Sequence, residues 1–213
     1  MNLGQIIRRI QIILDDPAIL RADIITKVND KLVAATATVC IPLLDTEKTV
    51  TVAADGLTVV MPTEWQHDLL SAFSNTNTRH LTIRTGTKAL YEGYDKTDDG
   101  EDIKEVAAVG DTLHVRPRAG AEEIINLQFY GIPATLAQDA DIPVSIPAHL
   151  HEKILVSGPA YEMLPDVTME AQRKVALASL HNGKESAGLA LLDAYFSYAP
   201  RATPAVRRKI KWF

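Results

Sequence analysis

The sequence contains a single cysteine, Cys40, among its 213 residues. One thiol excludes a disulfide framework within the chain and any zinc site that needs several cysteines. Cys40 lies between Val39 and Ile41 in an apolar run. We therefore expect it to be buried and chemically inert.

Long apolar segments are missing too. No run approaches the roughly 20 residues that span a membrane, and the first residues lack the basic and then apolar pattern of a secretory signal. With 46% hydrophobic and 23% charged residues, the composition is that of a globular protein. We expect a soluble, unsecreted protein without a membrane partner.

The sequence has no overall excess of positive charge. Its 22 Lys and Arg residues are outnumbered by 27 Asp and Glu residues, which gives a formal net charge of −5. This balance argues against sequence-independent DNA binding as the main task of the protein.

Familiar catalytic motifs are absent as well. Residues 183–185 read Gly-Lys-Glu and lack the upstream glycine and the hydroxyl residue of a phosphate-binding loop. The Gly-x-Ser-x-Gly pattern of a nucleophile elbow does not occur. We predict no catalytic residue, no cofactor and no enzymatic activity, with an enzyme of unfamiliar type as the alternative.

Two clusters resemble metal sites only in part. His149 and His151 precede Glu152, but residues two apart on a helix point about 200° away from each other, so we expect surface or capping histidines. Residues 95–102 resemble the start of a calcium loop, yet Val106 stands where the bidentate carboxylate is needed. We therefore predict no metal site.

Hydrophobic spacing predicts a helical hairpin in residues 1–37. Apolar residues from Leu3 to Leu14 recur every three or four positions and form one helix face. We expect this helix to end at Asp15. A second helix would then begin with Asp16 as its N-cap and Pro17 at its first position.

β-branched runs between turn residues predict a β-rich lobe at residues 38–130. Its expected strands cover residues 38–44, 49–53, 57–61, 80–85, 111–116 and 123–130. Asp55-Gly56 indicates a hairpin turn, and helical spacing predicts a short helix at 62–73. Residues 92–105 hold seven acids against two lysines and are interpreted as a solvated loop tip.

Prolines and renewed helical spacing follow the lobe. Residues 131–147 are interpreted as a proline-rich crossover in which Asp139 and Asp141 form turns. Residues 148–199 are expected to form two helices, the second kinked near Gly183. The prediction is an α+β fold in which the terminal helix pairs pack together and the antiparallel β lobe is inserted between them in sequence.

Residues 200–213 form a basic tail, expected to be extended. Five cations, no acids and two final aromatic residues make it suitable for docking in a groove of an acidic protein partner. A solvated, frayed end and a contact with nucleic acid are the alternatives. The predicted docking residues are Arg201, Arg207, Arg208, Lys209, Lys211, Trp212 and Phe213.

Residues 126–164 contain the most distinctive sequence pattern. A strand ending in Phe129-Tyr130 is followed by Pro-Ala-x-Leu, by Asp-x-Asp, and by a helix of small residues with Ala160-Tyr161. This pattern, together with the order of elements along the chain, resembles the head-to-tail connector or adaptor proteins of the tailed-bacteriophage neck. The chain lacks the tryptophan-centred helix that many relatives carry after Pro17, which leaves the subgroup and tail type open.

The resemblance implies a structural protein of the virion neck, assembled in the host cytoplasm. It implies a homo-oligomeric ring of about twelve copies below the portal protein, contacting a tail, nozzle or further neck protein on the other side. DNA would pass through a central channel without sequence-specific binding, past acids such as those of residues 92–105. A tail completion or terminator protein and an oligosaccharide- or peptide-binding module are the alternatives.

Overall fold

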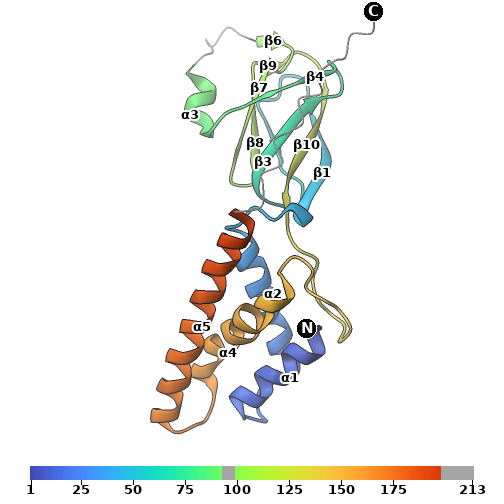
Figure 1. Cartoon of the computed structure of the whole chain (residues 1–213). Helices are drawn as coiled ribbons and strands as arrows, with labels where there is room; N and C mark the ends of the chain where they lie inside the picture. The colour runs from blue at the N-terminus through green and yellow to red at the C-terminus, as the bar shows by residue number, and fades with distance from the viewer. Residues whose placement is uncertain (93–98, 198–213) are drawn as a thin grey trace, which may run out of the picture. The chain divides into compact units, whose positions relative to one another are not determined.

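The computed structural model describes residues 1–92 and 99–197, with the backbone only at residues 99–101 (Figure 1). These residues form the predicted α+β fold. They divide into two compact units. We call Met1–Cys40 together with the residues from Ala134 onward the helical unit, and Ile41–Pro133 the β unit.

The helical unit begins with two helices, α1 (Leu3–Leu14) and α2 (Arg21–Thr36). The α1 helix is capped by reciprocal hydrogen bonds between Asn2 and Gln5, and it buries the predicted apolar face. The predicted start of the second helix is wrong. The Asp16 carboxylate instead accepts from the backbone N–H groups of Ala18 and Thr168, so it fixes a turn.

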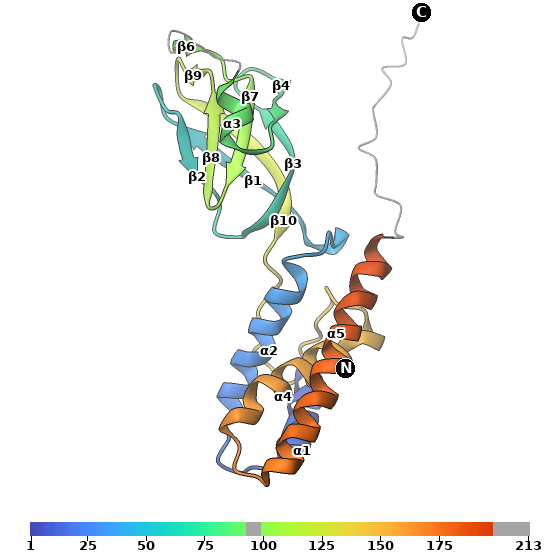
Figure 2. The same ribbon diagram turned by 90° about the vertical axis from the view of Figure 1, so that its left-hand side faces the viewer.

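A further helical segment packs against both helices in the helical unit (Figure 2). It consists of η2 (Ala148–Leu150), η3 (Glu152–Val156), α4 (Ser157–Met163) and η4 (Leu164–Asp166). Every residue from Ile154 to Ala160 is buried, as expected for a helix surrounded by α1, α2 and the last helix, α5 (Ala171–Ser197). The η3 turn is a wide π-helix directly before Pro159, whose ring would crowd the carbonyl of Leu155 in an α-helix.

Helix α5 (Ala171–Ser197) completes the helical unit and passes through Gly183 without a break. Only a narrow stripe of it is buried: His181, Glu185, Gly188 and Leu192. A Cβ at Gly188 would lie 2.8 Å from the Cβ of Lys153, so this glycine allows α5 to approach η3 closely.

The β unit is built from two four-stranded sheets. The first has the order β1 (Asp45–Val52), β10 (Glu123–Gly131), β3 (Trp65–Ser74), β4 (Arg79–His80) and is antiparallel. The second has the order β2 (Thr58–Val60), β8 (Thr112–Arg116), β7 (Glu105–Val109), β5 (Thr82–Ile83), with β5 parallel to β7. Short elements complete the unit: η1 (Pro42–Leu44), α3 (Gly86–Tyr91), β6 (Asp99–Glu101) and β9 (Arg118–Ala119).

One hydrophobic core joins the two sheets. Alternate residues of β10, including Leu127 and Phe129, are fully buried against Leu113 and Val115 of β8. The ring of Trp65 meets that of Phe129 edge to face, with centroids 5.4 Å apart. The β unit therefore has its own core.

The helix predicted at residues 62–73 is wrong, because this segment belongs to strand β3. Its pairing with β10 shifts register between Gln128 and Gly131, near Asp68, whose φ is +50°. Such bulges break the alternation of a strand and leave apolar residues three or four positions apart. That spacing imitates a helix.

Two further predictions for the β unit are corrected, and one strand was missed. Residues 38–44 form a turn and then η1, because Pro42 starts a 3-10 helix. The Asp55-Gly56 turn connects strands of different sheets, so it is no hairpin. A hairpin does join β7 to β8 at Gly110, which has a φ of +57°, and strand β7 was not predicted.

The close approach at Gly188 can be tested by substitution. Gly188→Ala should lower the free energy of unfolding by about 1–3 kcal/mol, because the added Cβ overlaps η3. Gly183→Ala is the matched control: its Cβ would meet nothing within 4 Å, so it should stabilise by about 0.5–1 kcal/mol. Urea unfolding followed by circular dichroism measures both, and equal effects would contradict the packing.

Candidate functional site

The predicted docking residues Arg201, Arg207, Arg208, Lys209, Lys211, Trp212 and Phe213 all lie outside the described residues. The described surface nearest to them in sequence is that of helix α5. This helix is flanked by two grooves, both formed within the helical unit. We describe them as the candidate site.

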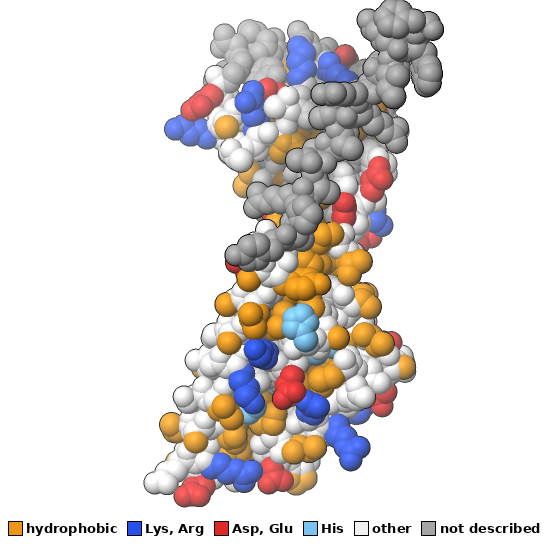
Figure 3. Space-filling view, viewed as in Figure 1, with side chains coloured by type: hydrophobic (Ala, Val, Ile, Leu, Met, Phe, Trp, Pro, Cys, Tyr) orange, Lys and Arg blue, Asp and Glu red, His pale blue; other side chains and the backbone are white. Residues whose placement is uncertain are grey.

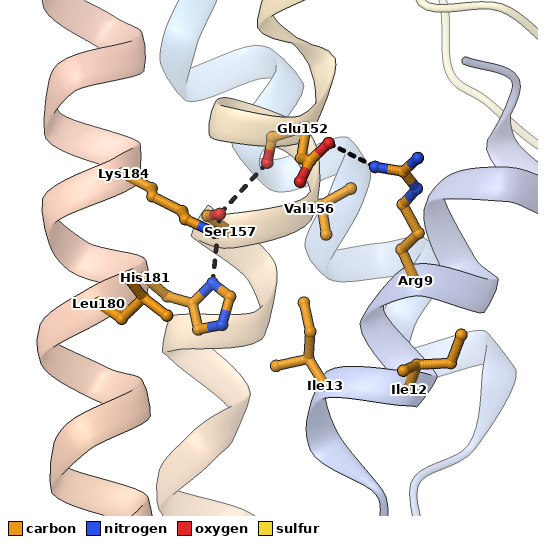
Figure 4. A pocket seen from close by; sticks show the side chains of 9 residues that line it. All are labelled: Arg9, Ile12, Ile13, Glu152, Val156, Ser157, Leu180, His181 and Lys184. Atoms are coloured by element: carbon orange, nitrogen blue, oxygen red, sulfur yellow. Dashed lines mark hydrogen bonds and ion pairs between the residues drawn. The ribbon is translucent and has the colours of Figure 1, made fainter.

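The first groove lies between α1, the η3–α4 segment and α5, with a volume of about 380 Å³ (Figure 4). Apolar side chains of α1 face His181 and Lys184 of α5 across it. Its lining residues are Arg9, Ile12, Ile13, Glu152, Val156, Ser157, Leu180, His181 and Lys184.

A chain of hydrogen bonds fixes His181 in this groove. The Ser157 hydroxyl donates to the carbonyl of Glu152 (3.2 Å), so its oxygen accepts from Nδ1 of His181 (3.2 Å). Burial, and then the charge of Lys184, lower the pKa of His181, which favours the neutral ring. Arg9 forms an ion pair with the Glu152 side chain at the rim.

The second groove, of about 440 Å³, lies between α2, η3 and α5. Most of its floor is made of small and apolar side chains. The lining residues are Lys31, Ala34, Ala35, Thr38, Val39, Ile154, Glu185, Leu189 and Asp193.

A nearly buried ionic cluster lies at this groove and connects three helices. The ammonium group of Lys31 lies 2.7 Å from Glu162 of α4 and 2.6 Å from Glu185 of α5. The side chains of Lys31 and Glu185 are only 17% and 10% exposed. Burial acts to lower the pKa of Lys31, but the hydrogen bonds and charges of the two carboxylates outweigh it and raise that pKa.

The expectation of surface or capping histidines is wrong for His151 but confirmed for His149. His151 is 1% exposed and its Nε2 donates to the carbonyl of Ile146 (2.7 Å), while Nδ1 lies 3.0 Å from the amino group of Met1. Burial lowers the pKa of His151. His149 is exposed, with its ring 5.9 Å from that of Tyr195. The described residues contain no cluster of three metal-ligating side chains.

The other singled-out residues have structural roles. Asp141 accepts from the backbone N–H groups of Ala137 and Gln138, which lowers its pKa and confirms its turn-forming role. Asp139 forms an ion pair with Arg21. The expectation of a buried thiol is wrong, since Cys40 is exposed.

Of the calcium-like segment at residues 95–102, positions 95–98 lie outside the described residues and 99–101 are described by backbone alone. The acids that follow are close to arginines: Asp102 lies 3.9 Å from Arg79, and Glu105 forms two hydrogen bonds with Arg84.

The comparison with known families adds what the geometry alone does not give. The sequence profile of the SU10 adaptor protein family matches residues 1–208. The chain belongs to the SU10 adaptor protein family. A search of curated proteins found no match. The family consists of structural, non-enzymatic phage proteins, so the chain is a phage structural adaptor that associates with other head or tail proteins in the virion.

Hydrophobic side chains gather on the face of the adaptor's helical unit that Figure 3 shows. Several large side chains are more than half exposed: Ile12, Leu20, Ile142, Val144, Val175 and Tyr195. Exposed apolar side chains that gather on one face are typical of protein interaction surfaces. In the described part of the chain, no helix is long and apolar enough to cross a membrane.

Sequence reasoning missed the two grooves. One signal was available, since residues 186–196 of the second C-terminal helix contain a single charged residue, Asp193. A helix with so little charge is normally covered on most sides. The positions of Lys184 and Asp193 in different grooves depend on the packing of α1 and α2 against α5.

The ionic cluster can be tested with a matched pair of lysines. Lys31→Met should destabilise the adaptor by about 3 kcal/mol, because Glu185 is left buried without its cation. Lys27→Met removes a cation that is 43% exposed and 3.5 Å from Glu162, and should cost less than about 1 kcal/mol. Similar losses in urea unfolding would contradict the assignment.

The buried histidines predict a loss of stability in mild acid. Because the pKa values of His151 and His181 are lowered in the folded state, the unfolded chain binds more protons below about pH 6.5. The free energy of unfolding should be level above that pH and fall between about pH 6.5 and 5.

A substitution at His181 distinguishes its contribution to the pH dependence of stability from that of His151. His181→Asn keeps a donor near the position of Nδ1 but cannot titrate, so it should lose less stability than the wild type between about pH 7.5 and 5. Urea titrations at both pH values measure the difference. An identical loss in the two proteins would exclude His181 as a source of the effect.

Proposed function

We propose that the adaptor forms a homo-oligomeric ring, of about twelve copies, that joins the portal protein of the phage head to the tail or to a further neck protein. The observation that carries this proposal is the family match over residues 1–208. A central channel in the ring would let DNA pass during ejection.

The distribution of charge supports a role beside moving DNA. The basic tail, residues 201–213, has a charge of +5, so residues 1–200 carry −10. A mostly acidic protein repels phosphates and would not hold DNA as it slides past. The acids within residues 92–105 would contribute to this repulsion if they face the channel.

The basic tail would attach the ring to the portal. An arm with five cations and two aromatic residues gains affinity by ordering on the surface of a partner that is already assembled. The tail follows α5, whose last described residue is Ser197, so it would connect the helical unit directly to the portal.

Deletion of residues 201–213 tests this assignment. The truncated adaptor should keep the melting temperature of the full chain but lose at least about tenfold in affinity for portal rings of the same phage, measured by co-sedimentation. A full-length variant with Trp212 and Phe213 changed to alanine shows how much the aromatic residues contribute. Unchanged portal binding by the truncated protein would contradict the docking role, and a much lower melting temperature would make the tail part of the core.

A further inference from the structure

The second half of helix α5 exposes side chains that the described residues of a single copy leave uncovered. Between Ser186 and Phe196 only Gly188 and Leu192 are buried and only Asp193 is charged. Leu191 and Tyr195 are 45% and 53% exposed. A helix that is apolar around most of its circumference is normally enclosed by other elements.

The two grooves lie on opposite flanks of this helix. Lys184 lines the first groove and Asp193 lines the second. The two residues are nine positions apart, which at about 100° per residue places them on opposite sides of α5. Each lies beside an apolar residue of the same helix, Leu180 and Leu189 respectively.

The charges of the grooves are complementary. In the first groove Arg9 and Glu152 neutralise each other, which leaves the positive charge of Lys184. In the second, Lys31 and Glu185 are paired, which leaves the negative charge of Asp193.

The two remaining charges lack a counter-ion among the residues that the structure describes. Within that part of the chain, neither Lys184 nor Asp193 forms an ion pair. The Asp193 carboxylate accepts a 3.3 Å hydrogen bond from the Ser197 hydroxyl, one helical turn away. Both side chains can therefore form an ion pair with a second molecule.

From this arrangement we infer that the first groove of one copy packs against the second groove of the next copy, with Lys184 facing Asp193. The inference rests on the proposed ring and names the surfaces that build it. An interface between two different faces repeats from copy to copy, and it closes into a ring when the rotation allows. The exposed leucines beside each groove would be covered in the same contact.

Charge reversal tests this pairing with the full chain. Lys184→Glu alone and Asp193→Lys alone each place like charges opposite each other, which should raise the dissociation constant for self-association at least about tenfold. The double variant restores opposite charges and should associate within about threefold of the wild type. Sedimentation velocity over a range of concentrations measures all four proteins.

A mixture provides a sharper test. The Lys184→Glu protein has an acidic residue on both flanks of α5, and the Asp193→Lys protein has a basic residue on both. Each variant can therefore pair only with the other, and an equimolar mixture should associate although neither does alone. Arg173→Glu, the same charge change elsewhere on α5 at a residue that is 53% exposed, should leave association unchanged.

The outcomes separate this inference from the proposed ring. Single variants that assemble like the wild type would overturn the pairing and leave the ring standing. Failure of both the double variant and the mixture, with helical content unchanged by circular dichroism, would also overturn the pairing. A wild type that stays as single copies at every concentration, both alone and mixed with portal rings, would overturn the ring, and the pairing with it.

Discussion

The helical unit depends on the burial of one short helical segment, from Ile154 to Ala160. Because this segment is apolar or small on every side, it must be surrounded, and α1, α2 and α5 all pack against it. The residues that surround it come from both ends of the sequence. This requirement explains why the β unit is an insertion between helices that belong together.

Helix α5 is bound to that core in a different way from α1. The α1 helix buries five large aliphatic residues, whereas the buried stripe of α5 includes His181, Glu185 and Gly188. Hydrogen bonds, the ion pair with Lys31 and close backbone approach therefore replace much of the hydrophobic contact. The apolar residues of α5 remain on its flanks and outer side, where they are available to another molecule. In the proposed ring, the stability of a single copy and the contact between copies would thus come from different faces of one helix.

The sequence was sufficient to predict an element where its local residue pattern matches the face that the element buries. The spacing of apolar residues from Leu3 to Leu14 predicted α1, and a β-branched run between turn residues predicted β10, an inner strand of the first sheet. The sequence was insufficient where contacts with residues far apart in the sequence determine the local structure or the burial of a side chain. The bulge near Asp68 comes from pairing with β10, and the burial of His151 depends on Ile146 and Met1. The grooves beside α5 likewise exist only after three helices have packed, although the lack of charge in the helix was visible in advance. The basic tail stays a prediction.

The central claim is that this phage adaptor acts as a ring on the portal. Electron microscopy of the purified protein, alone and mixed with portal rings of the same phage, tests it most directly. The account predicts rings stacked coaxially on the portal, with a copy number that can be counted in projection. Single copies that do not bind the portal under any condition would contradict it.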